Sequence, residues 1–262
     1  MQVDDLCKAR LFCFAESGTD GCLPRFPMLL DSVQAIRFVA ERLDSLAERV
    51  VFLGGATLGL FITEPGAAPP RPTKDVDLIV EITVLEYLDN SFRSQLLSRG
   101  FREVLDEGVI CRWVVDETKV DIMPAASGIL GFSNRWYPTS VAQAQRYQFS
   151  GGPNIRLISP ACFLATKLEA FANRGRGDFL SHDLEDVIAV IDGRPTIEKE
   201  IESATPEIRE FLARELARLL ASQAFLESLH GQLRGDSAGQ ARLPGLIARL
   251  HRIARTTPPV ST

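Results

Sequence analysis

Three aspartates on two strand-like segments are the residues of this chain best suited to chemistry. Asp75 and Asp77 alternate with apolar residues in segment 75–82, and Asp121 does so in segment 119–123. Successive side chains of a strand point to opposite faces, so Asp75 and Asp77 point the same way, about 7 Å apart. Carboxylates this close repel one another unless cations lie between them. If the second strand pairs beside the first, Asp121 completes a cluster of three carboxylates.

Such an oxygen-rich cluster suits Mg²⁺ or Mn²⁺, because these ions keep coordination positions for water and for substrate phosphates. Two ions are expected, one activating an attacking hydroxyl and one spanning a triphosphate. Asp121 would either ligate an ion or accept the proton of the acceptor. Acidic residues at alternating strand positions can also simply face water on an open sheet face. The choice between these two interpretations depends on the residues that precede the aspartates.

A glycine pair stands at the end of an apolar strand, in Leu53-Gly54-Gly55-Ala56-Thr57. Glycines let the backbone turn sharply and come close to a ligand, and the N–H groups at the start of a helix attract phosphate. The segment lacks the G-K-[S/T] ending of a P-loop, and it does not fit G-x-G-x-x-G. It therefore predicts a phosphate-seating turn of another kind.

The elements that position these residues follow from the spacing of apolar and turn-forming residues. Helices are predicted at 27–49, 56–62 and 84–99, and strands at 50–53, 75–82, 109–115, 119–123 and 156–158, with a Pro-rich loop at 64–72 and a hairpin turn at 116–118. Beyond residue 159 only helices are predicted, at 161–173, 182–191, 195–203, 206–231 and 243–255.

We therefore predict an α+β protein with a change of character near residue 159. Residues 1–26 form a lead-in of uncertain structure, 27–158 a small mixed sheet flanked by helices, and 159–262 a helical C-terminal domain. No apolar run approaches the roughly 20 residues of a membrane-spanning helix, and the N-terminus does not resemble a secretory signal. The expected location is cytoplasmic, with no membrane contact.

Charge and metal-ligand spacing exclude several other classes of protein. The net charge of −5 argues against a protein that coats nucleic acid. The five cysteines are scattered without a C-x-x-C pair, so free thiols are expected, and the three histidines lack zinc-ligand spacing. The last helix carries a basic face, which could hold a nucleic-acid acceptor or could simply be solvated. This face consists of Arg242, Arg249, Arg252 and Arg255.

The order of apolar strand, Gly-Gly, helix, D-x-D strand and later strand aspartate resembles the DNA polymerase β-like nucleotidyltransferase superfamily over residues 50–125. That superfamily has hG[GS], then Dh[DE], then a third acid on a neighbouring strand. Ala56 stands where a serine is usual, so Thr57 would have to supply the side-chain contact to phosphate. The gap between Gly55 and Asp75 is longer than usual, and the Pro-rich segment accounts for the excess.

The helical half is similar to the AbiEii-type nucleotidyltransferases, the toxin halves of bacterial abortive-infection toxin–antitoxin pairs. Lys167 begins a K-x-x-A match, and residues 182–187 match [RK]-D-x-x-D-[LIV] with His182 at the basic position. The resemblance implies that Lys167 contacts the triphosphate and that Asp183 and Asp186 support the site. On their residue types alone, Lys167 could be an exposed helix lysine, and the two acids could merely favour the start of a helix.

The resemblance implies an enzyme that moves a nucleoside monophosphate from an NTP to an acceptor and releases pyrophosphate. Gly54, Gly55, Thr57 and Lys167 would bind the nucleotide, and 27–158 would be the catalytic domain. The acceptor could be tRNA, another RNA, a protein hydroxyl, a small molecule or a second nucleotide, and an antitoxin protein is an expected partner.

Three other functions share parts of this residue pattern. Ala56 slightly favours a non-catalytic nucleotidyltransferase-fold binding protein. A D-x-D glycosyltransferase is less favoured, because too few residues precede the motif for the usual nucleotide-binding unit. A haloacid-dehalogenase-type phosphatase requires Thr or Val where this chain has Ile79.

Overall fold

The computed structural model describes residues 31–73, 75–81, 90–104, 111–126, 134–175 and 177–255. The predicted lead-in 1–26 lies outside the described residues, as do the first residues of the predicted helix at 27–49. Parts of the predicted helix at 84–99 and strand at 109–115 also lie outside them. Among the described residues, no helix is long and apolar enough to span a bilayer.

A seven-stranded mixed sheet forms the centre of the protein, with strand order β3-β4-β5-β2-β1-β7-β6. The strands are β1 Val50–Leu53, β2 Asp75–Val80, β3 Phe101–Glu103, β4 Arg112–Val115, β5 Thr118–Pro124, β6 Gln145–Gln148 and β7 Asn154–Leu157. β2 runs parallel to β5 and β1 parallel to β7, and the other neighbouring pairs are antiparallel. The predicted α+β class with a mixed sheet is confirmed. β3 and β6 were not predicted, because β3 is very short and β6 is a polar edge strand without apolar alternation.

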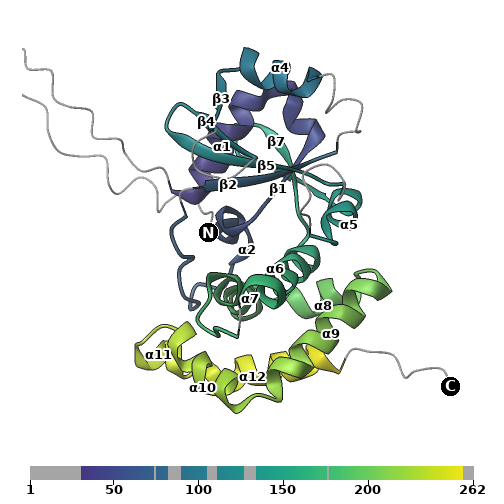
Figure 1. The fold of residues 1–262 in the computed structure, drawn as a ribbon. Helices are drawn as coiled ribbons and strands as arrows, with labels where there is room; N and C mark the ends of the chain where they lie inside the picture. The colour runs from purple at the N-terminus through teal and green to yellow at the C-terminus, as the bar shows by residue number, and fades with distance from the viewer. Residues whose placement is uncertain are drawn as a thin grey trace, which may run out of the picture.

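Helices cover both faces of the sheet and continue into a separate layer (Figure 1). The first half contains α1 Ser32–Leu43, the 3₁₀ turns η3 Asp44–Arg49 and η4 Gly55–Thr57, α2 Leu58–Phe61, α4 Ser91–Ser98 and α5 Tyr137–Ala142. The second half contains α6 Pro160–Arg174, α7 His182–Gly193, α8 Ile197–Glu202, α9 Pro206–Leu220, α10 Gln223–Gln232, α11 Ser237–Gln240 and α12 Leu243–Ala254. Figure 1 shows α1 and α4 on one side of the sheet, α6 and α7 on the other, and α9 to α12 farthest from the sheet.

Two predicted helices are shorter in the structure. The expected single helix at 206–231 is wrong: α9 ends at Leu220, and Ser222 accepts a hydrogen bond from the Phe225 N–H (3.4 Å) as the N-cap of α10. The apolar spacing continues across this break because both helices bury an apolar face, so periodicity alone hid the cap. Similarly, α1 ends at Leu43, where Asp44 has a φ of 51° before the 3₁₀ turn.

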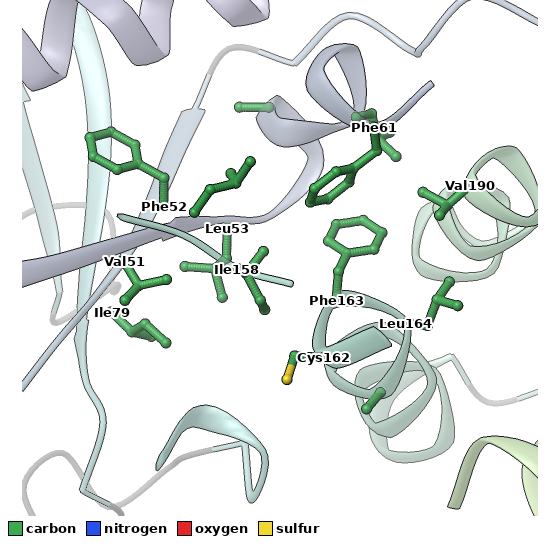
Figure 2. Close-up of a cluster of buried hydrophobic side chains, with 14 of the residues drawn as sticks. Val51, Phe52, Leu53, Phe61, Ile79, Ile158, Cys162, Phe163, Leu164 and Val190 are labelled. Atoms are coloured by element: carbon green, nitrogen blue, oxygen red, sulfur yellow. The ribbon is translucent and has the colours of Figure 1, made fainter. Parts of the chain in front are cut away.

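The sheet and the helical half share one core. β1 is buried along its whole length, and Figure 2 shows Val51 on the side of α6 and Phe52 pointing away from it. The rings of Phe61 and Phe163 meet edge to face with centroids 5.2 Å apart, a geometry that adds about 0.5–1.5 kcal/mol to simple burial. The chain passes from β7 into α6 at Ser159, whose hydroxyl accepts from the Cys162 N–H. Buried apolar residues form one continuous cluster across this point, which fixes α6 and α7 against the glycine turn.

Candidate active site

The three sheet aspartates project from one face of two neighbouring strands. Asp77 on β2 pairs in register with Asp121 on the parallel strand β5, and Asp75 precedes Asp77 by two residues on β2. Register partners point to the same side of a sheet, and so do residues two apart on a strand. The alternating residues Val76 and Val120 are buried on the opposite face. The sheet therefore brings the three carboxylates together, as the alternation predicted.

The glycine turn lies directly against Asp77. Leu53, the last residue of β1, is the register partner of Asp77, and Gly54 follows with a φ of 76°. A Cβ atom on Gly54 would collide with the Asp77 carboxylate, so both the backbone conformation and the space require glycine. Thr57 is fully buried, and its hydroxyl donates to the Gly54 carbonyl oxygen at 2.8 Å. In this conformation the Thr57 hydroxyl closes the turn.

An arginine that the sequence pattern did not single out bridges two of the aspartates. Arg112 on β4 is the register partner of Asp121. Its Nε and Nη2 donate to the two carboxylate oxygens of Asp121, both at 2.8 Å, and Nη2 lies 3.4 Å from Asp75 Oδ2. A bidentate pair of this kind is among the stronger hydrogen-bonded contacts in proteins. The signal was available: a two-residue turn at 116–117 pairs Val115 with Thr118, and counting back along the hairpin pairs 112 with 121.

The electrostatics of the cluster favour the arrival of positive charge. Burial, opposed by Lys167 and assisted by the neighbouring carboxylates of Asp121 and Asp75, raises the pKa of Asp77 to about 7. Repelling carboxylates of this kind are stabilised by a cation. The all-carboxylate donor set and its common orientation fit Mg²⁺ or Mn²⁺. In the part of the chain that the structure describes, no three metal-ligating side chains are close enough together to hold an ion in the present conformation. The Arg112 guanidinium instead lies between the carboxylates of Asp75 and Asp121.

A second charged cluster joins α6 to α7. Lys167 Nζ lies 2.6 Å from Asp186 Oδ2 and 3.2 Å from Asp183 Oδ1. Arg174, at the end of α6, donates to both oxygens of Asp183 at 2.7 and 2.9 Å. The Lys167 side chain is only 13% exposed, and Asp186 is fully buried. The motif residues of the helical half therefore meet in a compact ion-pair network beside the turn.

Burial and pairing act on these groups in opposite directions. Burial by itself would lower the pKa of Lys167, but the carboxylates of Asp186 and Asp183 outweigh it and raise that pKa, so the ammonium stays charged. Burial would raise the pKa of Asp183, but Arg174 and Lys167 lower it. The pKa of Asp186 is raised, chiefly by burial. Lys167 is therefore not the exposed lysine considered above, and the two acids are partners of Lys167 rather than simple helix-start residues.

A tyrosine also lies near the sheet aspartates. Tyr137 on α5 donates its hydroxyl to the Met123 sulfur at 3.2 Å, and burial together with the charge of Asp77 raises the pKa of its phenol. By contrast, His182 forms a surface pair with Glu185 at 3.2 Å. The sequence contained no spacing signal for Tyr137, because α5 itself was not predicted.

The arginines of the last helix are not a free basic face. Arg242 donates its Nε to both carboxylate oxygens of Asp192 at 3.0 Å, and Arg249 and Arg252 pair with Glu198 at 3.1 and 2.7 Å. These three side chains fasten α12 to the end of α7 and the start of α8. The face is therefore paired with acids of α7 and α8, although the Arg252 side chain is still 57% exposed.

A family model described as "Nucleotidyl transferase AbiEii toxin, Type IV TA system" matches residues 37–242, which includes both charged clusters. No curated protein matches the chain. The match agrees with the AbiEii resemblance seen in the sequence.

Several solved structures match the chain at low sequence identity. An antigenic nucleotidyltransferase-like protein from Paracoccidioides brasiliensis has 22% identity and a TM-score of 0.48, with 76% of this chain and 91% of that chain covered. A nucleotidyltransferase described as putative from H. pylori has 11% identity and a TM-score of 0.41, with 86% and 93% covered. The antibiotic-resistance factor ANT(2'')-Ia has 13% identity and a TM-score of 0.41, with 77% and 99% covered. At these values the likenesses carry no argument about activity.

Proposed function

Because the chain belongs to the AbiEii nucleotidyltransferase toxin family, we propose that it transfers a nucleoside monophosphate from an NTP to a hydroxyl of an acceptor, with the help of two Mg²⁺ or Mn²⁺ ions. The observation that carries this proposal is the in-register pairing of Asp77 with Asp121, with Asp75 on the same face and the glycine turn against Asp77. Carboxylates that face one another beside a phosphate-seating turn have a clear use in phosphoryl chemistry.

Each group of residues has its own part in the proposal. The turn at Gly54 and Gly55 seats the triphosphate, and Lys167 neutralises its outer phosphates. Asp75, Asp77 and Asp121 would hold the ions, which when bound activate the acceptor hydroxyl and neutralise phosphate charge. The acceptor oxygen forms a bond to the α-phosphorus, and the bond from that phosphorus to the β-phosphate oxygen breaks. Pyrophosphate leaves with the electron pair, and the acceptor proton is lost to a carboxylate or to water.

A transfer assay tests the proposal and identifies the acceptor. The purified chain is incubated with Mg²⁺ or Mn²⁺ and each of four α-labelled NTPs, in the presence of total RNA or total protein. We expect label to appear on one acceptor class with one preferred NTP. The D75N/D77N double variant should lose the transfer while keeping its circular dichroism spectrum, and the exposed hairpin variant D116N should keep its activity. Full activity in the double variant would overturn the proposal.

We also infer an antitoxin partner, because the family description is that of a toxin in a type IV toxin–antitoxin system. Expression of the chain alone should slow growth of the host cell, and expression of D77N to the same level should not. Co-expression of the neighbouring reading frame should restore growth. If the wild type and D77N slow growth equally, the toxicity does not come from nucleotidyl transfer.

A further inference from the structure

Arg71 reaches the glycine turn from the Pro-rich loop that separates the turn from β2. Its side chain is 29% exposed, and its two acidic neighbours lie on α7. Arg71 Nε lies 3.6 Å from Glu185 Oε2, and Nη2 lies 3.9 Å from Asp186 Oδ1. Both separations exceed the length of a hydrogen bond. The guanidinium is therefore attracted to two carboxylates without being hydrogen-bonded to either.

The position of this guanidinium relative to the turn is well defined. A Cβ atom built on Gly55 would lie 3.6 Å from Arg71 Nη2 and 3.6 Å from Asp186 Oδ2. The same carboxylate oxygen, Asp186 Oδ2, lies 2.6 Å from Lys167 Nζ. Two cations from different parts of the chain therefore converge on one buried carboxylate next to Gly55.

The pairing of Arg71 is poor in comparison with other arginines of the chain. Its Nε is buried without a hydrogen-bond acceptor, and neither oxygen of Asp186 has a hydrogen bond of good geometry. Arg194, in contrast, donates to both oxygens of Glu200 at 2.6 and 2.7 Å. A buried donor without an acceptor destabilises the folded protein. Such a cost at a turn that seats phosphate indicates that the missing acceptor belongs to a ligand.

We propose that Arg71 binds the terminal phosphates of the NTP. In the absence of nucleotide, Glu185 and Asp186 hold its guanidinium loosely above Gly55. When the nucleotide is bound, the planar fork of the guanidinium donates to phosphate oxygens in a bidentate contact, and Lys167 remains the second cation. The proposal rests on the proposed function, and it gives the Pro-rich loop a role in recognising triphosphates over monophosphates.

Equilibrium binding of ATP, GTP, CTP and UTP and of the four matching monophosphates to the full chain, with Mg²⁺ and no acceptor, tests the role of Arg71. R71Q should weaken binding of the preferred NTP about tenfold and leave the monophosphate affinity unchanged, since only the outer phosphates lose a charged contact. R71K should recover part of the loss. E185Q should strengthen NTP binding about two- to threefold, because it removes a carboxylate that competes with phosphate for Arg71.

The opposite signs of R71Q and E185Q separate this role from a structural ion pair. If both variants weaken NTP binding, or if R71Q weakens NTP and monophosphate equally, Arg71 only supports the fold and the proposal is overturned. R194Q, which breaks a well-formed arginine pair elsewhere, is the matched control and should not change the ratio of NTP to monophosphate affinity. A wild type that binds no NTP overturns the proposed function itself, whereas a wild type and R71Q that bind NTP equally overturn only the inference about Arg71.

Discussion

The protein contains two clusters of buried charge a short distance apart, and they are built on opposite principles. On the sheet, three carboxylates face one another with Arg112 as a partial counter-ion, and the pKa of Asp77 is raised to about 7. Between α6 and α7, two carboxylates meet two cations, and the pKa of Lys167 is raised by its partners. The sheet cluster carries an excess of negative charge, and the helix cluster is nearly balanced.

The two clusters contribute differently to stability and to binding. A balanced buried network holds its elements in a fixed geometry, because removal of one partner leaves a buried charge without compensation for its lost hydration. An unbalanced cluster lowers stability in the absence of a ligand, and such sites are typical of binding and catalysis. We therefore expect charge removal to destabilise the helix cluster and to stabilise the sheet cluster.

The largest expected effect is on Lys167. K167M leaves the fully buried Asp186 carboxylate without its nearer cation, and loss of one partner of a buried pair typically costs about 3–5 kcal/mol. The free energy of unfolding, measured with urea at pH 8, should fall by this amount. The loss should be smaller at pH 5, because an unpaired buried carboxyl takes up a proton.

The double variant K167M/D186N is the matched control for this loss. It removes both charges, so it should be more stable than K167M. If K167M unfolds with nearly the wild-type free energy, or if the double variant is the less stable of the two, the helix cluster is not a balanced network.

The opposite sign is expected for Asp77. The folded state has a pKa of about 7 here and the unfolded chain one near 3.8, so the folded protein binds the extra proton between these values and its stability falls as pH rises through that window. In metal-free buffer at pH 8, D77N should raise the free energy of unfolding by about 2 kcal/mol while lowering transfer at least about 100-fold. The gain should vanish near pH 4.

Thermal unfolding in a chelator at pH 4 and pH 8 measures this dependence, with D116N as the control. Asp116 lies on an exposed hairpin and pairs with Arg42, so its replacement should leave the pH dependence intact. A D77N variant less stable than the wild type at pH 8 would show that the carboxylate of Asp77 contributes to the fold.

The sequence predicted the sheet cluster better than its surroundings, for a physical reason. Strand alternation fixes the face of Asp75 and Asp77 without knowledge of the rest of the fold. The contact of Arg112 could have been found by counting back along the hairpin, whereas that of Arg71 depends on where a loop crosses α7, which no local pattern encodes. Lys167 was identified only through a family resemblance, because the composition of its helix does not reveal which face meets α7.

Arg112 provides the third test, because its guanidinium pairs with two of the three sheet carboxylates. R112Q removes positive charge from the carboxylates of Asp75 and Asp121 and frees their oxygens. The affinity of the chain for Mn²⁺ without nucleotide, followed by electron paramagnetic resonance, should rise about tenfold, equivalent to about 1.4 kcal/mol. R93Q, which breaks an exposed pair with Glu103, should leave the affinity unchanged. Weaker Mn²⁺ binding by R112Q would show that Arg112 organises the carboxylates instead of competing with an ion.

The arginines of α12 show how a charge pattern can be misread when its partners are distant in sequence. Arg249 donates its Nη1 to the Ile191 carbonyl at 2.5 Å, at the end of α7, where the helix dipole is negative. The partners lie some 50 residues earlier in the chain, so the spacing of the arginines along α12 alone indicated only a basic face.

The smallest expected effect follows from this arrangement. R249Q removes a cation from the carboxyl end of α7 and one of the pairs to Glu198, and it should lower the free energy of unfolding by about 1 kcal/mol. R255Q, at the exposed end of the same helix, should change it by less than about 0.5 kcal/mol. Urea unfolding of both variants, together with RNA binding at low salt, makes the distinction. If R249Q retains wild-type stability but loses RNA affinity, α12 is a nucleic-acid surface after all, and its ion pairs give way when RNA is bound.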